Sequence, residues 1–277
     1  MDIEILGPLV VRVGGQQVRL GPALRVLLLA LLCAGGDLVP AARLAGMLSE
    51  TGMSRNAPAT LRSHVSHLRR ALSDATGLEH GRTPTVSLLT DNVGGSTAYS
   101  LRVHSDRVDA SRFEAGVAAG MRELHHGRFD SASEMLRSAV SLRRGKPLAD
   151  VADRAFAQAE IARLEGSYRT ASLAQVQADV QRGLHRTVIG ELQSMTDLWP
   201  DDEMVSLLLV ICLYRSGRSA EAARVCRAAI EITLEHGLDP RRLTALQLDV
   251  LSGSLPPAGL PHMPSAPLAS HAVTPAR

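Results

Sequence analysis

Apolar residues recur every three or four positions in the segment Ala57–Leu72, which is the period of an amphipathic helix. The apolar stripe consists of Leu61, Val65, Leu68 and Leu72. The rest of the surface carries arginine, serine and histidine, and the segment contains no acidic residue. Such a helix suits a groove lined with phosphates, because arginine donates to phosphates and to guanine edges. An ordinary solvated basic face is the alternative for this helix taken alone.

The flanking segments predict the other elements of a winged helix-turn-helix. Proline at its start and two glycines at its end delimit the first predicted helix. The predicted elements are a small sheet or hairpin in Met1–Leu20, helices over Pro22–Ala34 and Pro40–Leu48, a loop over Ser49–Asn56, the basic helix, and strands over Val86–Thr90 and Ala98–Val103. The last two strands flank a glycine-rich tip, Asp91–Thr97, and predict a hairpin. In this order the third helix enters the major groove and the hairpin lies along the DNA backbone.

The second half of the chain predicts an all-α domain built from helical pairs. Gly183 and Gly217 are 34 residues apart, and each is expected to open the second helix of a pair. The segments that begin at Gly127 and Gly217 align with matching alanines, as in tetratricopeptide repeats. The longest uninterrupted helical pattern covers Asp153–Gln181. An irregular helical bundle is the alternative, and either arrangement offers surfaces for partners rather than a reaction centre.

The chain resembles the SARP family, the antibiotic regulatory activators of Streptomyces and its relatives. The opening MDIEILGPLVVRVGG and the LRSHVSHLRRAL core of the basic helix resemble the OmpR-type winged-helix DNA-binding domain of that family. The segment Val108–Gly253 resembles the bacterial transcriptional activation domain that follows it. Its marks are VDASRFE at Val108–Glu114, LRRGKPLADVAD at Leu142–Asp153 and LYRSGRSAEA at Leu213–Ala222.

The expected architecture is mainly α. A winged helix-turn-helix (α+β) over residues 1–105 precedes an all-α, tetratricopeptide-like domain over residues 106–253. Residues 254–277 are rich in proline, alanine and serine and contain one charged side chain, Arg277, so we expect a disordered tail.

The residues expected to contact DNA lie on the basic helix and on the hairpin. They are Thr60, Arg62, Ser63, Ser66, His67, Arg69, Arg70, Ser96, Thr97 and Arg102. The exposed positions from Arg62 to His67 are expected to contact bases, and Arg69 and Arg70 to neutralise phosphates. Members of the family usually carry glutamine or a similar residue at the position of Arg62 and arginine at that of His67. The resemblance therefore implies which positions contact DNA, but not which bases they prefer.

The resemblance implies a sequence-specific DNA-binding transcriptional activator of an antibiotic or secondary-metabolite gene cluster. It also implies a homodimer on double-stranded promoter DNA, with direct repeats near the −35 element, and recruitment of RNA polymerase holoenzyme. One alternative is a helical-repeat adaptor whose winged helix docks proteins, although an adaptor has no reason to exclude acids from Ala57–Leu72. Another is a repressor that uses the same DNA contacts.

No catalytic motif is recognisable, so we expect neither enzymatic activity nor a cofactor. A P-loop, a G-x-G-x-x-G after a strand and a G-x-S-x-G are all absent from the sequence. His64 and His67 share helical spacing, but no carboxylate or thiolate lies close in sequence to complete a metal site. We therefore expect no bound metal.

Cysteine usage and the absence of a signal segment predict a cytoplasmic, nucleoid-associated protein without membrane contact. The apolar run Leu24–Cys33 contains Arg25 and is too short to span a bilayer. Three cysteines do not make a disulfide framework, and each lies in an apolar helical run. Buried, reduced thiols are expected at Cys33, Cys212 and Cys226.

Overall fold

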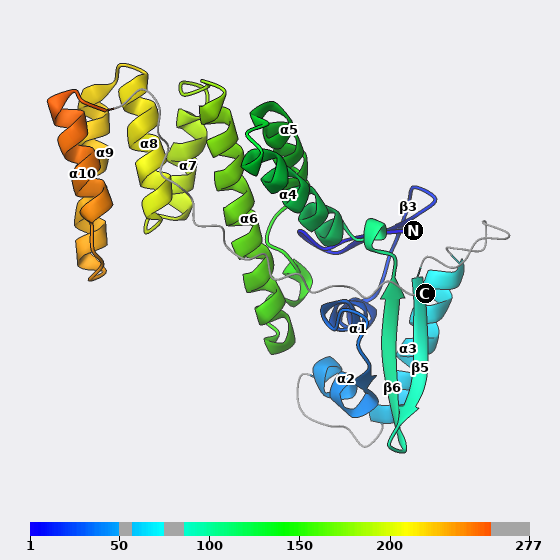
Figure 1. Ribbon diagram of the computed structural model, residues 1–277. Helices are drawn as coiled ribbons and strands as arrows, with labels where there is room; N and C mark the ends of the chain where they lie inside the picture. The colour runs from blue at the N-terminus through cyan, green and yellow to red at the C-terminus, as the bar shows by residue number, and fades with distance from the viewer. Residues whose placement is uncertain (50–56, 75–85, 256–277) are drawn as a thin grey trace. The chain divides into compact units, whose positions relative to one another are not determined.

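The structure is a computed structural model that describes residues 1–49, 57–74 and 86–255 (Figure 1). The predicted loop Ser49–Asn56 falls almost entirely outside the described residues, and so does most of the predicted tail. Contacts group the chain into two compact units. Among the described residues, the first unit contains Met1–Gly116 and Ala139–Tyr168, and the second contains Val117–Ser138 and residues 169–255.

The chain begins with a small antiparallel sheet, as predicted. Its strands are β1 (Asp2–Glu4), β2 (Val10–Val13) and β3 (Gln16–Val18), in the order β1-β2-β3. Gly14 and Gly15 join β2 to β3 with positive φ angles of 52° and 81°. A two-residue turn of this kind favours glycine, because residues with a Cβ resist positive φ.

Three helices and a second sheet follow in the first unit and confirm the winged helix-turn-helix. The elements are α1 (Pro22–Cys33), β4 (Val39–Pro40), α2 (Ala41–Leu48), α3 (Ala57–Asp74), β5 (Val86–Val93) and β6 (Ser96–Val103). The strand order is β4-β6-β5, with β6 antiparallel to both neighbours. All four residues of the α3 stripe are buried, at most 4% exposed. The stripe therefore packs into the core, as its period predicts.

The hairpin loop is shorter than predicted. Strand pairing continues to Val93 and Ser96, so only Gly94 and Gly95 form the turn, instead of the whole segment Asp91–Thr97. Their φ angles are 57° and 80°. Because two glycines adopt this conformation without strain, the polar residues on either side remain in the ladder.

Seven helices make up the rest of the described chain. They are α4 (Asp109–His125), α5 (Phe129–Val140), α6 (Ala155–Gln181), α7 (Ile189–Leu198), α8 (Glu203–Arg215), α9 (Ser219–Glu235) and α10 (Arg241–Ser252). Short 3₁₀ turns lie at Ser105–Arg107 and Ala149–Val151. In the second unit, α8 is buried from Met204 to Leu213 and packs against α7, α9 and α10, which explains why this stretch is apolar apart from Ser206.

Glycine ends the first helix of each pair with the same hydrogen bonds. The Gly127 N–H donates to the Leu124 carbonyl (3.0 Å), and the Arg128 N–H donates to the Glu123 carbonyl (2.9 Å). The same arrangement recurs at Gly183 and Gly217. This is the Schellman cap, which satisfies carbonyls at a helix end. Glycine thus closes the preceding helix rather than opening the next one.

The cysteines differ in burial. Burial raises the pKa of Cys212 to about 12 and that of Cys226 to about 11. Cys33 is only half-buried, because it is the last residue of α1. The prediction that it is buried is therefore wrong. No helix among the described residues is both long and apolar enough to cross a membrane.

Candidate nucleic-acid interface

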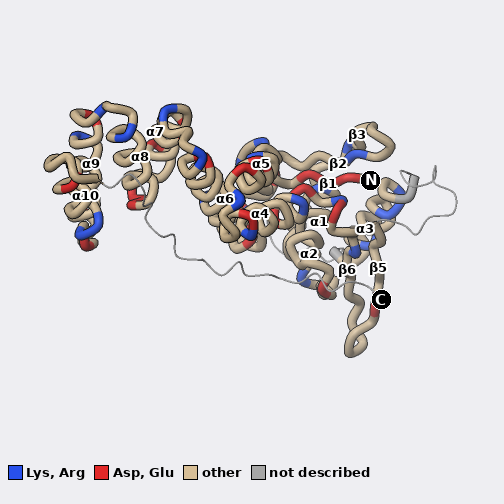
Figure 2. Tube along the Cα trace, turned by 45° about the horizontal axis from the view of Figure 1, so that its top comes forward, with Lys and Arg blue, Asp and Glu red and all other residues tan. Residues whose placement is uncertain are grey.

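The outer face of α3 exposes most of the residues predicted to contact DNA. The exposed members are Thr60, Arg62, Ser63, Ser66, His67 and Arg70. They share one face because they lie opposite the buried stripe at helical spacing. The Arg62 Nε donates to the Pro58 carbonyl one turn earlier (3.3 Å). Figure 2 shows the basic positions along α3.

Arg69 makes a different contact from the one predicted. Its Nε donates to the Leu88 carbonyl (2.9 Å), and its Nη2 donates to the Thr90 hydroxyl (2.5 Å). Both acceptors belong to β5, so Arg69 joins α3 to the hairpin, and the two elements lie side by side (Figure 1). A contact to phosphate by Arg69 stays a prediction. No local signal in the sequence reveals its β5 partners.

The hairpin residues predicted to contact DNA lie at two separate places on the hairpin. Ser96 and Thr97 are exposed beside the glycine turn. Arg102 is also exposed, but it pairs with Ser87 near the other end of the ladder. At about 3.3 Å per residue, Arg102 lies ~17 Å along the strand from Thr97, so the structure does not bring these two together.

Tyr99 anchors the hairpin. It is 3% exposed and pairs with Val39 of β4. Tyr99 therefore packs into the core rather than facing outward.

Two carboxylates of the helical half hold the loop that follows β1, a contact that sequence reasoning missed. Asp109 accepts hydrogen bonds from the N–H groups of Ile5 (2.7 Å) and Leu6 (3.0 Å). Asp150 accepts from the Leu9 N–H (2.6 Å) and forms an ion pair with Arg25 of α1 (2.6 Å). Both acids belong to motifs that carry the family resemblance, VDASRFE and LRRGKPLADVAD. The acidic residues of these two motifs were therefore the sequence feature that could have indicated the contact with the loop after β1.

Backbone bonds reinforce the same contact. The Arg144 N–H donates to the Leu6 carbonyl, and the Leu148 N–H donates to the Ile5 carbonyl, both at 2.8 Å. Burial raises the pKa of the Asp109 carboxyl, while its three backbone hydrogen bonds oppose that rise. Residues 139–168 therefore belong physically to the winged-helix unit, and they fix its first sheet and α1 in place.

A winged helix-turn-helix whose third helix exposes basic residues is a fold that many DNA-binding proteins use. Residues 108–251 match the family model of the bacterial transcriptional activator domain. The chain belongs to the SARP family, and it is a transcriptional regulator.

Individual relatives agree with this assignment. The chain is 31% identical over 254 residues to the regulatory protein DnrI of Streptomyces peucetius. That alignment covers 91% of this chain and 92% of DnrI. It is 30% identical over 243 residues to the transcriptional regulatory protein EmbR of Mycobacterium tuberculosis, covering 87% of this chain and 60% of EmbR.

The fold also matches a solved structure. EmbR of Mycobacterium tuberculosis in complex with a low-affinity phosphopeptide aligns with a TM-score of 0.79 at 28% identity. The alignment covers 92% of this chain and 65% of that chain.

Proposed function

We propose that the chain is a sequence-specific transcriptional activator that inserts α3 into the major groove of promoter DNA. The observation that carries this proposal is the exposed face of α3, which has arginine, serine and histidine and no acid between Ala57 and Leu72. An acid on this face would be repelled by phosphate, whereas the side chains present donate hydrogen bonds to bases and phosphates.

Each part of the surface receives a role. Arg62, Ser63, Ser66 and His67 contact base edges, together with Thr60 at the start of the exposed face. Arg70 contacts phosphate. Ser96 and Thr97 at the hairpin tip contact the DNA backbone, and Arg102 contacts it from the far end of β6. Arg69 is a positioning residue that holds β5 against α3. Its charge also adds to the positive potential that attracts DNA phosphates.

The remaining parts of the proposal rest on the family. Two protomers bind direct repeats near the −35 element about one helical turn apart, so that both lie on the same face of the DNA. The domain over residues 106–253 contributes to that homodimer and to recruitment of RNA polymerase holoenzyme, and residues 1–105 contain the DNA-binding elements. The regulated genes belong to an antibiotic or other secondary-metabolite cluster. The proposal assigns no catalytic step to the chain.

Fluorescence anisotropy with two duplexes tests the DNA-binding roles. One duplex carries the intergenic DNA beside the protein's own gene, and the other is a scrambled duplex of equal length. Arg62→Ala should cost about 1–3 kcal/mol on the native duplex and little on the scrambled one, because base contacts carry sequence preference. Arg70→Ala should weaken both duplexes alike.

Arg227→Ala is the matched control, because Arg227 is exposed on α9 in the other unit. It should leave both affinities unchanged. If Arg62→Ala and Arg70→Ala behave like this control, α3 does not face DNA. Transcription from the bound promoter in vitro then separates an activator from a repressor.

A further inference from the structure

Helix α10 is the last helix among the described residues, and its outer face exposes two leucines (Figure 1). The inner face packs against α9 and α8 through Leu243, Leu246 and Val250, each at most 8% exposed. On the outer face, Leu248 and Leu251 are 64% and 67% exposed. The terminal helix of a stacked array needs a polar outer face to stay soluble alone. These leucines therefore indicate a contact with a further helix.

The outer face of α10 is complementary to a second copy of itself. Thr244 and Ala245 lie one turn before Leu248, and Leu251 and Ser252 lie one turn after it, all of them exposed. In an antiparallel copy whose Leu248 meets Leu248 of the first, the large Leu251 of each copy lies against the small Thr244 and Ala245 of the other. Such self-complementarity is what a twofold contact requires.

The charges at the ends of α10 favour the antiparallel arrangement over the parallel one. The first turn contains Arg241 and Arg242 and no acid. Each arginine forms an ion pair, with Asp239 and Glu203 respectively, but the Arg241 side chain is still 89% exposed. A parallel copy would bring the arginines of both chains together. An antiparallel copy separates them and places each pair beside the C-terminal carbonyls of the other helix, where cations are favourable.

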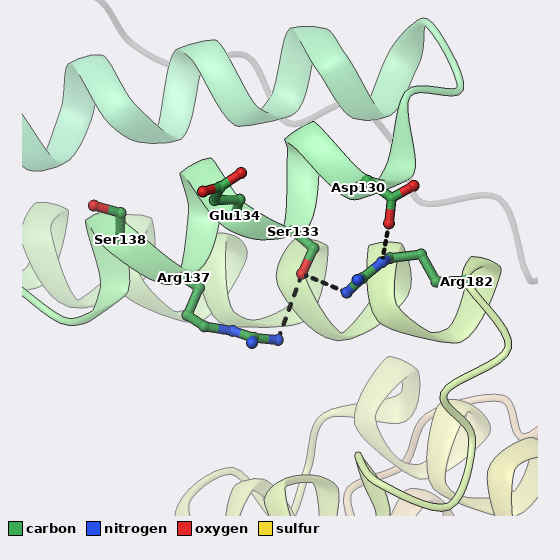
Figure 3. A pocket seen from close by; sticks show the side chains of 6 residues that line it. All are labelled: Asp130, Ser133, Glu134, Arg137, Ser138 and Arg182. Atoms are coloured by element: carbon green, nitrogen blue, oxygen red, sulfur yellow. Dashed lines mark hydrogen bonds and ion pairs between the residues drawn. The ribbon is translucent and has the colours of Figure 1, made fainter.

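The polar pocket beside α5 and α6 in the same unit gives no comparable reason for a partner (Figure 3). Arg137 and Arg182 both donate to Asp179 (2.7 Å each), and Arg182 also donates to Asp130 (2.6 Å). The charges of that pocket are thus balanced within the unit, whereas the leucines of α10 stay exposed to water.

We propose that two copies of the chain associate in solution through α10, packed antiparallel about a twofold axis at Leu248. The exposed residues from Thr244 to Ser252 are all uncharged, so this face suits an apolar helix and not a nucleic acid. A contact of one helix from each copy is smaller than a standard interface of about 1,600 Å², and we expect a dissociation constant in the micromolar range. The association needs no DNA, so it goes beyond the homodimer proposed on direct repeats.

Sedimentation velocity of the full chain without DNA, at micromolar to submillimolar concentrations, tests the proposal. The mass should rise with concentration from the 29.5 kDa of one chain toward twice that value. Leu248→Glu should weaken association at least tenfold, because two carboxylates would face each other across the axis, and Leu248→Lys should do the same. An equimolar mixture of these two variants should associate at least tenfold more tightly than either alone, since glutamate then faces lysine. A misfolded variant would not recover in this way.

Leu198→Glu is the matched control, because Leu198 on α7 of the same unit is also 67% exposed. It should leave association unchanged. A chain that stays monomeric throughout would overturn the proposal, whether residues 256–277 or another protein covers α10. Equal losses with Leu198→Glu and Leu248→Glu, or a mixture without recovery, would also overturn it. Because the samples contain no DNA, the outcome is independent of the DNA-binding proposal.

Discussion

Replacing Asp109 with asparagine should destabilise the winged-helix unit by about 2–4 kcal/mol. The Asp109 Oδ1 accepts from Ile5 (2.7 Å) and Ala110 (2.8 Å), and its Oδ2 accepts from Leu6 (3.0 Å). An asparagine amide keeps the oxygen that accepts from Ile5 and Ala110, but it directs its NH₂ group at the Leu6 N–H. That change removes a hydrogen bond to a charged acceptor, worth about 1.5–3 kcal/mol, and leaves a buried donor unpaired at a cost of about 1–3 kcal/mol. These two costs overlap, and removing the buried charge relieves part of its desolvation penalty, which gives the stated range.

Urea unfolding at pH 7, followed by circular dichroism, measures this change. Asp106→Asn is the matched control, because the Asp106 side chain is 58% exposed in ion pairs with His104 and Arg107. It should cost less than about 1 kcal/mol. If Asp109→Asn costs no more than Asp106→Asn, the hydrogen bonds to the loop after β1 do not hold the unit together.

Two further predictions concern single contacts. Arg69→Met should speed amide hydrogen exchange in β5, because it removes both hydrogen bonds that the Arg69 guanidinium donates to that strand. Arg70→Met should leave the exchange rate unchanged. Equal exchange rates in the two variants would show that Arg69 does not support the hairpin. Gly120→Ala should lower the melting temperature, since its Cβ would lie 2.5 Å from the Leu136 Cγ and such overpacking costs about 1–3 kcal/mol. Gly166→Ala should raise the melting temperature, because its added Cβ would have no heavy atom of the described residues within 4 Å outside its own stretch of helix; a fall of similar size in both variants would contradict this.

Local periodicity predicted most of the helices, because the buried stripe of a helix repeats within a short stretch of sequence. The stripe from Leu61 to Leu72 identified α3 and its inward face correctly. The boundaries of the hairpin were less accurate. Whether pairing stops at Thr90, as predicted, or continues to Val93 depends on the turn that Gly94 and Gly95 adopt, and not on the polarity of the flanking residues.

Contacts between distant residues were not predictable from these patterns. The Arg69 guanidinium bonds to β5, and the loop after β1 binds Asp109, which lies more than a hundred positions later. In the sequence, Arg69 is indistinguishable from its exposed neighbour Arg70. The pairing of Arg137 and Arg182 around Asp179 likewise requires α5 and α6 to be packed together first.

The central claim is that α3 binds DNA, and a salt titration tests it most directly. Affinity for the native intergenic duplex and for scrambled DNA is measured against salt concentration, with the wild-type chain and Arg70→Ala. We expect the native duplex to bind at least tenfold tighter. The logarithm of affinity should fall linearly with the logarithm of salt, and Arg70→Ala should reduce that slope by about 0.9, the value for one lost phosphate contact. Equal affinity for both duplexes, with the same slope in wild type and Arg70→Ala, would contradict the account.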